Sequence, residues 1–448
     1  MKKPIIISII MLILFMMVSC TSDLPSPVNT TVTPTQSPST TETTTPEPQE
    51  TAKPTDTPTP TPTPTPDATQ SPTPTPDGTE APASDPESTG TPTYPVLTGD
   101  PDRAPIQVKA IYLSGSVVGA RFDHYIDLLN QTELNALVID IKEGGYVNYK
   151  SNVPLVKELG LSVNNYNPEE IIKKCHDNNI YVIGRIVCFR DNGLPKKKPE
   201  YGIKKPDGTL WGEKTSTGTI YWANPSIPEV QQYNINIAKE AIALGFDEIQ
   251  FDYVRFPTGK ASEFAYAADM PSKGDVIAGF LGRASQEIKK VKQVPVSADV
   301  FGIIGESDSD GKALGQVLSQ LGQNVDYISP MIYPSHYAND SHGTMGNGVG
   351  QTINGVLFTQ PDLHPYEVVY NALLKIKSKI STYAGFRADV RPYIQDFTAT
   401  YLPKGYFQDY GVEQIRQQIQ AVKDAGYNEW IFWDGSNTYT EDAFEKNP

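Results

Sequence analysis

The feature that most constrains the fold is an eightfold alternation, after residue 105, between short runs of β-branched residues and longer amphipathic stretches. The apolar runs predict strands at 108–115, 135–143, 180–189, 247–256, 294–302, 326–337, 390–397 and 429–437. Stretches such as 228–245 and 412–426 lie between them and predict helices, and the second ends in the glycine that commonly follows a helix.

Eight strand-helix units favour an α/β fold in which a parallel sheet closes on itself as a (β/α)8 TIM barrel. The roughly 340 residues from Ile106 to Pro448 suit one such barrel with insertions. An open, doubly wound sheet is the alternative. That fold usually has a glycine-rich phosphate turn after its first strand, and this sequence has none there.

Residues 1–20 have the pattern of an export signal, with two lysines, an apolar run from Ile5 to Val18, and then Ser19 and Cys20. A transmembrane anchor is the alternative, but the run is shorter than the roughly 20 residues that a spanning helix needs. The end of the segment resembles a bacterial lipobox. We therefore expect lipid attachment at Cys20, which would anchor the protein on the extracellular face of the cell membrane, with plain secretion as the other possibility.

Residues 21–105 are rich in threonine and proline, and contain 21 of the 39 prolines in the chain. Proline removes backbone donors, and large apolar side chains are scarce, so no core can form there. We expect a disordered, extended linker, followed by one barrel domain over 106–448.

The charge and cysteine content narrow the classes of partner. A formal net charge of −15 argues against nucleic acid and against polyanionic substrates. Apart from Cys20, the cysteines are Cys175 and Cys188, which lack metal-ligand spacing and which we interpret as buried free thiols rather than a disulfide. We expect a monomer with no cofactor and no metal.

Polar side chains recur where the predicted strands end, which in a TIM barrel is where the loops that form active sites converge. A single aspartate at such a position more often caps a helix or braces a loop, but several together favour a site. The candidates are Glu143, Asp252, Asp299, Tyr333, His336, Asp396 and Asp434.

Asp252 and Asp299 end neighbouring strands, so their carboxyl groups should lie close enough for the paired chemistry of glycoside cleavage. Arg255 could keep Asp252 ionised. It stands three residues further on, so this contact requires a bend at the strand end, and a loop-bracing salt bridge is the equal alternative.

Aromatic side chains at the strand ends could supply the flat surfaces on which sugar rings pack. Tyr253, Tyr333, Tyr337 and Trp433 are the candidates. Core packing is the alternative for each, and strand parity predicts that either Trp433 or its neighbour Phe432 lies behind the barrel wall.

The runs FDEIQFDYVRFP, PVSADVFG, VDYISPMIYPSHY and RPYIQDF resemble a bacterial family of glycoside-hydrolase-like TIM barrels that is otherwise a domain of unknown function. The family is more distantly similar to α-amylase-type barrels. The resemblance implies that Asp252 is the nucleophile and Asp299 the acid/base. The acid is usually a glutamate in those barrels, so Glu143 or Glu306 could replace Asp299 in that role. The resemblance also implies a polar residue after the last strand, where Asp434 stands.

These observations predict a glycoside hydrolase that acts on an extracellular or cell-wall polysaccharide. Asp252, Asp299 and Glu143 are the catalytic candidates; Arg255, Tyr333, His336, Tyr253, Asp434, Trp433 and Asp140 are the substrate-binding candidates.

Two other functions stay open. A carbohydrate-binding barrel without activity would use the same surfaces. A metal-dependent polysaccharide deacetylase would need a histidine and aspartate cluster, for which the sequence offers only His336 and His342 at short spacing.

Overall fold

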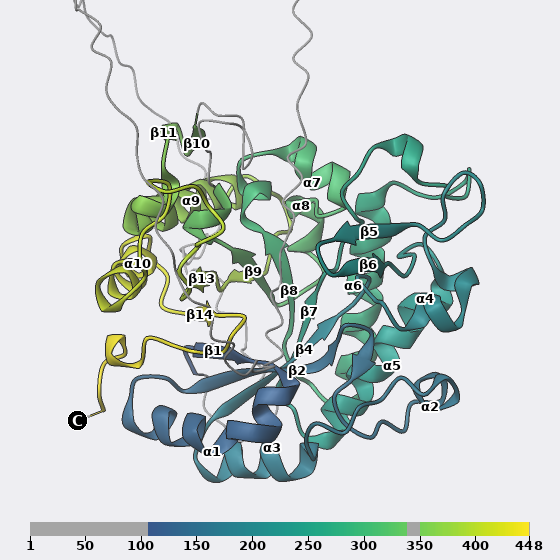
Figure 1. Cartoon of the computed structure of the whole chain (residues 1–448), viewed down its shortest axis with the longest axis horizontal. Helices are drawn as coiled ribbons and strands as arrows, with labels where there is room; N and C mark the ends of the chain where they lie inside the picture. Colours follow the sequence, from purple (N-terminus) through teal and green to yellow (C-terminus); the bar gives the residue numbers. More distant parts are fainter. Residues whose placement is uncertain (1–105, 338–349, 448) are drawn as a thin grey trace, which may run out of the picture. The chain divides into compact units, whose positions relative to one another are not determined.

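The computed structural model describes residues 106–337 and 350–447. Over these residues eight parallel strands form one closed barrel (Figure 1). They are β1 (Lys109–Leu113), β2 (Ala136–Glu143), β4 (Tyr181–Val187), β7 (Glu248–Asp252), β8 (Val296–Phe301), β9 (Tyr327–Met331), β13 (Tyr393–Gln395) and β14 (Trp430–Trp433). The barrel closes because β1 pairs with β2 on one side and with β14 on the other. The predicted TIM barrel is confirmed, and the open sheet is excluded.

Helices surround the strands, with α1 and α3 along the lower edge of Figure 1 and α9 and α10 at its left. The longer helices are α1 (Gly115–Gln131), α3 (Pro168–Asp177), α5 (Pro228–Leu244), α6 (Lys273–Val291), α9 (Pro365–Ile380) and α10 (Val412–Asp424). Short helices are α2 (Pro154–Leu159), α4 (Leu194–Lys197), α7 (Asp308–Leu314) and α8 (Leu318–Leu321). The two helices predicted by periodicity are α5 and α10. Each is followed by a glycine with a positive φ, 114° at Gly245 and 84° at Gly426, a conformation that favours glycine.

Smaller elements decorate the barrel. Three strand pairs are antiparallel: β5 (Gly212–Thr215) with β6 (Gly218–Tyr221), β10 (Gln351–Ile353) with β11 (Val356–Phe358), and β3 (Tyr146–Val147) with the end of β2. The short strand β12 (Asp389–Val390) pairs in parallel with β9. Single turns of 3-10 helix are η1 (Pro199–Tyr201), η2 (Ala261–Glu263), η3 (Gly302–Gly305), η4 (Pro334–Tyr337), η5 (Pro361–Leu363) and η6 (Glu441–Ala443). The β5–β6 hairpin belongs to the long loop between β4 and α5, at the end of the barrel where active sites form.

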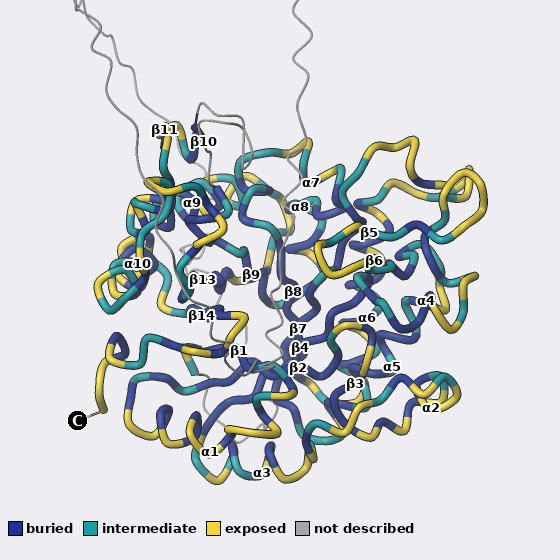
Figure 2. Tube along the Cα trace, in the orientation of Figure 1, coloured by how far each residue is buried: buried dark blue, intermediate teal, exposed yellow. Residues whose placement is uncertain are grey.

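The strands are buried on both faces, and the tube along them is mostly dark blue in Figure 2. Alternate residues face the helices or the barrel interior, as the period of two in a strand requires. In β14, Phe432 packs in the layer shared with the helices, whereas Trp433 packs with the interior residues. Phe432 is therefore the aromatic residue behind the barrel wall. Cys175 and Cys188 are both buried and are not joined in a disulfide, as predicted.

The predicted export signal, Cys20 and the predicted linker over 21–105 lie outside the described residues, as does His342. Within the described residues, none of the helices is both long enough and apolar enough to span a bilayer.

Candidate active site

A pocket opens inside the barrel at the carboxyl ends of the strands. Its lining combines two carboxylates, two guanidinium groups and a ring of large side chains: Arg185, Asp252, Tyr253, Arg255, Asp299, Phe301, Gln316, Met331, Tyr333, Tyr393 and Trp433. Six of these are candidates from the sequence, namely Asp252, Asp299, Tyr253, Arg255, Tyr333 and Trp433. The pocket therefore brings the proposed carboxylate pair together with aromatic surfaces.

Strand register places Asp252 beside Asp299. The last register pair between β7 and β8 is Phe251 with Ala298, so the next residues along the two parallel strands are the two aspartates. One nitrogen lies close to both side chains: Arg185 Nε is 3.1 Å from Asp252 Oδ2 and 3.9 Å from Asp299 Oδ2. These two oxygens can consequently be no more than about 7 Å apart, within the range of carboxylate separations in glycoside hydrolases.

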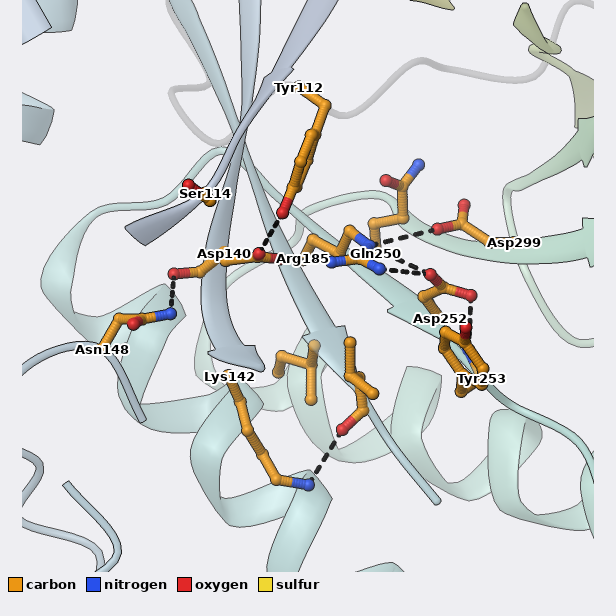
Figure 3. Close-up of polar contacts among 12 residues, drawn as sticks. Tyr112, Ser114, Asp140, Lys142, Asn148, Arg185, Gln250, Asp252, Tyr253 and Asp299 are labelled. Carbon is orange, nitrogen blue, oxygen red and sulfur yellow. Dashed lines mark hydrogen bonds and ion pairs between the residues drawn. The ribbon is translucent and has the colours of Figure 1, made fainter. Parts of the chain in front are cut away.

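Arg185 is the central cation of the site, and Figure 3 shows it reaching from β4 between Asp140 and Asp252. Its Nε and Nη2 donate to Asp252 Oδ2 at 3.1 and 2.5 Å, and Nη1 donates to Asp140. The guanidinium lies 5.2 Å from the ring centre of Tyr112 and 5.0 Å from that of Trp433. Two carboxylates and two rings therefore fix the orientation of Arg185, which in turn fixes Asp252.

Sequence reasoning missed Arg185, although it left a signal. The residue interrupts the apolar run 180–189 and has the same parity as Tyr181 and Ile183, whose side chains pack in the interior of the barrel. A charged residue in the middle of a buried strand must have a partner inside the protein. Here that partner is the proposed nucleophile.

Asp140 lies behind Arg185 and does not line the pocket. It is fully buried, accepts a hydrogen bond of 2.5 Å from the Tyr112 hydroxyl, and pairs with Arg185. Its geometry suits positioning of the guanidinium, whereas the sequence suggested contact with substrate.

Asp299 differs from Asp252 in its electrostatics. Burial, followed by the negative charge of Asp252, holds the pKa of Asp299 well above its ordinary value, and Arg185 opposes this only in part. Among the described residues, its Oδ1 has no hydrogen-bond partner. The strand end is fixed by Gln316, which donates to the Asp299 carbonyl at 3.1 Å and accepts from the Phe301 amide at 3.1 Å. Asp299 lines the pocket, and a protonated Asp299 would carry an O–H that no hydrogen bond among the described residues engages at Oδ1.

The chain turns sharply after Asp252. Tyr253 has a φ of 47°, which is unusual for a bulky residue and marks local strain. Its amide donates to Asp252 Oδ1. The sequence required such a bend at the strand end for Arg255 to approach Asp252. Arg255 does line the same pocket as Asp252.

The expected ion pair between Arg255 and Asp252 is nevertheless absent from the contacts of the described residues. Arg255 donates to the Phe256 carbonyl at 3.0 Å and lies against the rings of Trp222, Tyr253 and Phe301. Neither alternative from the sequence is found among the described residues, since Arg255 makes no ion pair there with Asp252 or with a loop carboxylate. Arg185, on the adjacent strand, donates to Asp252 Oδ2, and the Tyr253 amide donates to Oδ1.

Aromatic and apolar side chains form the remaining walls. Trp433 stacks on Tyr112 with ring centres 4.0 Å apart, and Tyr393 holds its place by donating to Gln250 at 2.5 Å. His336 lies outside the lining but contacts Tyr333 edge-on at 4.8 Å. Burial lowers the pKa of His336 to about 3, so this imidazole is neutral at physiological pH.

The other predicted carboxylates lie away from the pocket lining. Glu143 ends β2 beyond Asp140, and Glu306 accepts a hydrogen bond from the Asn354 amide at 3.1 Å. Asp434 accepts from Ser436 and Thr438, and Asp396 accepts from Thr440. The last two carboxylates therefore brace the loop after β14, the structural role that a single strand-end aspartate often has.

The deacetylase alternative depended on a metal site. In residues 106–337 and 350–447, no three or more histidine, cysteine, aspartate or glutamate side chains gather in a way that could hold a metal ion. One of the two histidines it needed, His342, is outside these ranges.

Comparison with solved structures shows what the barrel resembles. It is similar to the glycoside hydrolase domain of PgaB (BpsB) from Bordetella bronchiseptica, with 10% identity and a TM-score of 0.51 over 77% of this chain and 100% of that chain. A hypothetical protein from Ruminiclostridium thermocellum ATCC 27405 is 44% identical, with a TM-score of 0.39 over 42% of this chain and 97% of that chain. The α-galactosidase TtGalA from Thermus thermophilus is 11% identical, with a TM-score of 0.44 over 75% and 59% of the two chains.

No curated protein matches the chain. A protein-family model does match, over residues 110–439, and its description is "Putative glycosyl hydrolase domain". The matched range runs from the second residue of β1 to beyond β14, so it contains all but the first residue of the barrel strands and every residue of the pocket. The chain belongs to this family of glycosyl-hydrolase-like, carbohydrate-active TIM barrels.

Proposed function

We propose that the barrel hydrolyses a glycosidic bond of a polysaccharide, with Asp252 as the nucleophile and Asp299 as the acid and base. The observation that carries the proposal is the contrast between the two neighbouring aspartates. Asp252 is held by two hydrogen bonds that Arg185 donates to its Oδ2, so a guanidinium charge lies directly against this carboxyl group. Asp299 has a raised pKa and an oxygen without a partner among the described residues. One carboxylate and one carboxylic acid are what glycoside cleavage requires.

In the first step, an oxygen of Asp252 bonds to the anomeric carbon while the bond from that carbon to the leaving oxygen breaks. The proton of Asp299 passes to the leaving oxygen. Asp252 is then neutral as an ester, so it no longer raises the pKa of Asp299. Asp299 can now take a proton from water as the water oxygen bonds to the anomeric carbon and Asp252 leaves. The upper limit of about 7 Å between the carboxylate oxygens accommodates this retaining route better than the wider inverting one.

The location of the substrate is inferred from the N-terminal sequence. An export signal, acylation of Cys20 and a proline-rich linker over 21–105 would place the barrel outside the cell, anchored to the membrane and able to reach cell-wall or extracellular glycans. Replacing Cys20 by alanine should release the protein into the medium. A Cys20→Ala protein that stays in the membrane fraction would contradict lipid anchoring.

The catalytic roles are tested by comparing two variants on two kinds of substrate. Asp252→Asn should lower kcat/KM by on the order of 10³-fold or more on every glycoside, because the attacking charge is lost. Asp299→Asn should lower it severely on unactivated glycans and far less on aryl glycosides with good leaving groups, which depart without protonation. Rates are measured on purified barrel with wall glycans, exopolysaccharides and plant glucans, and with the corresponding aryl glycosides.

Asp269→Asn is the matched control, because Asp269 is exposed and lies outside the pocket; its rates should equal those of the wild type. Equal losses for the two active-site variants on both kinds of substrate would contradict the assigned roles. Binding of glycans by the wild type without turnover of any of them would instead favour a carbohydrate-binding barrel.

A further inference from the structure

Arg255 is a buried cation without a carboxylate partner among the described residues. It is 8% exposed, lines the pocket, and donates one hydrogen bond, to the Phe256 carbonyl. Three aromatic rings surround it, with the guanidinium carbon 4.8 Å from the centre of Trp222, 5.0 Å from Tyr253 and 4.6 Å from Phe301. Its remaining N–H donors are therefore available on the same pocket wall as the Asp252 and Asp299 pair.

The nearby carboxylates are already engaged elsewhere. Asp252 is held by Arg185. Glu213 pairs with Arg190 at 2.9 Å and accepts from the Trp222 indole at 3.1 Å. Burial consequently lowers the pKa of Arg255, which is the signature of an unpaired charge. Taking a guanidinium out of water is costly unless it is paired, and the surrounding rings compensate only in part.

We propose that Arg255 pairs with a carboxylate of the substrate, so that the sugar bound beside the two aspartates is an acidic one. This assignment rests on the proposed glycosidase function and names its substrate class. The planar guanidinium fork matches a carboxylate in two parallel hydrogen bonds. Such a carboxylate is found in uronic acids and in the lactyl ether of muramic acid.

The charge of the loop that packs against Arg255 favours an anionic ligand. The loop between β4 and α5, residues 188–227, supplies Trp222 and Arg190 and has seven lysines and arginines against four aspartates and glutamates. Its net charge is positive in a chain whose net charge is −15. The overall acidity disfavours long polyanions at a distance, since it acts through the field of the whole protein. A single carboxylate inside the pocket responds mainly to the charges that line it, and Arg255 is the cation there that has no carboxylate partner among the described residues.

The experiment measures binding on the full barrel carrying Asp299→Asn. Asparagine resembles the protonated form of Asp299 and blocks cleavage of unactivated glycans. Calorimetry compares oligogalacturonate and oligoglucuronate with their carboxyl-reduced, neutral counterparts. A second arm compares oligomers that alternate N-acetylglucosamine with N-acetylmuramic acid against chitin oligomers of equal length. In one of the two arms, the acidic ligand should bind about 10- to 100-fold more tightly than its neutral counterpart, the range expected for hydrogen bonds to a charged group. The arm in which this preference is seen shows whether the carboxylate belongs to a uronic acid or to muramic acid.

Arg255→Gln should abolish this preference, and Arg255→Lys should keep part of it because the charge remains. Arg387→Gln, which removes the same charge from an exposed position, should leave it unchanged. Equal affinity for every acidic ligand and its neutral counterpart would overturn the proposal without any variant. An equal loss for both ligands in Arg255→Gln would also overturn it, since Arg255 would then be structural. A preserved acidic preference in a wild-type protein that cleaves none of these glycans would reject the glycosidase while leaving the recognition by Arg255 intact.

Discussion

Two buried arginines occupy the two ends of the same barrel, and their surroundings differ. Arg391, at the end where the strands begin, donates to both oxygens of Glu248 at 2.9 and 3.1 Å and to Glu429 at 2.6 Å. Glu248 also accepts hydrogen bonds from Ser297 and Tyr181. Arg185, at the end where the strands end, donates hydrogen bonds to Asp140 and Asp252, and its Nε lies 3.9 Å from Asp299 Oδ2.

The difference between the two clusters is the degree to which they are satisfied. Both oxygens of Glu248 have partners inside the protein, whereas Asp299 Oδ1 has none among the described residues. A fully satisfied buried network fixes a structure. The second network leaves Asp299 Oδ1 without a hydrogen bond, and it lies next to the strained backbone turn at Tyr253 and to Arg255, which has no carboxylate partner among the described residues. Such features are typical of ligand-binding sites. We therefore propose that the cluster around Arg391 stabilises the fold and that the cluster around Arg185 takes part in catalysis.

The largest expected effect is on stability, at the structural cluster. Glu248→Gln should lower the free energy of unfolding by about 3–5 kcal/mol, because it leaves the buried guanidinium of Arg391 without its main partner. Denaturant titration measures the loss. The folded fraction should keep the wild-type kcat/KM. A double variant, Glu248→Met with Arg391→Met, should recover part of the stability because no charge is left unpaired. A Glu248→Gln protein with normal stability and impaired turnover would reverse the assignment of the two clusters.

The corresponding change at the proposed catalytic cluster is Arg185→Lys. We expect kcat to fall by about 100-fold, on the order of 3 kcal/mol in activation free energy, because an ammonium group cannot hold Asp140 and Asp252 at once as the fork does. Steady-state kinetics measure this. Circular dichroism should show unchanged secondary structure. Retention of full activity would show that Asp252 does not depend on Arg185 for its position.

The third prediction is the pH dependence of kcat/KM, which for a retaining enzyme reports only the first step. Asp299 must be protonated there, so kcat/KM should fall as the pH rises through its pKa. That pKa is held well above its ordinary value by burial and by Asp252, so the fall should occur at a higher pH than for an exposed aspartate, whose pKa is about 3.9.

Arg185→Gln should move this alkaline limb to still higher pH, because Arg185 lowers the pKa of Asp299. Asp299→Asn should remove the limb for activated aryl glycosides. An alkaline limb that is identical in Asp299→Asn would assign it to another group.

The smallest expected effect is at the loop after β14. Asp434→Ala removes hydrogen bonds from Ser436 and Thr438 and should cost about 1–2 kcal/mol of stability, with kcat/KM within about twofold of the wild type. Thermal melting and kinetics on an unactivated glycan measure both. If Asp434→Ala instead weakened glycan binding without lowering stability, Asp434 would be a substrate-binding residue, as the sequence suggested.

The sequence alone predicted the barrel, because eight apolar runs with helices between them can bury their surfaces in few other ways. It also predicted that Asp252 and Asp299 would be neighbours, since the carboxyl ends of adjacent parallel strands must lie side by side. Whether these two residues are catalytic stays a proposal.

Only the tertiary structure showed which charged side chains form ion pairs with one another. Arg255 is three residues from Asp252 in the sequence, yet the partner of Asp252 is Arg185, 67 residues away. It decided that Asp434 braces its own loop and that Asp140 lies behind the guanidinium instead of in the pocket. The physical reason is that strand spacing and periodicity are local properties that a sequence displays, whereas the partner of a buried charge depends on distances of a few ångströms across the barrel, set by strand register and by a single left-handed turn at Tyr253.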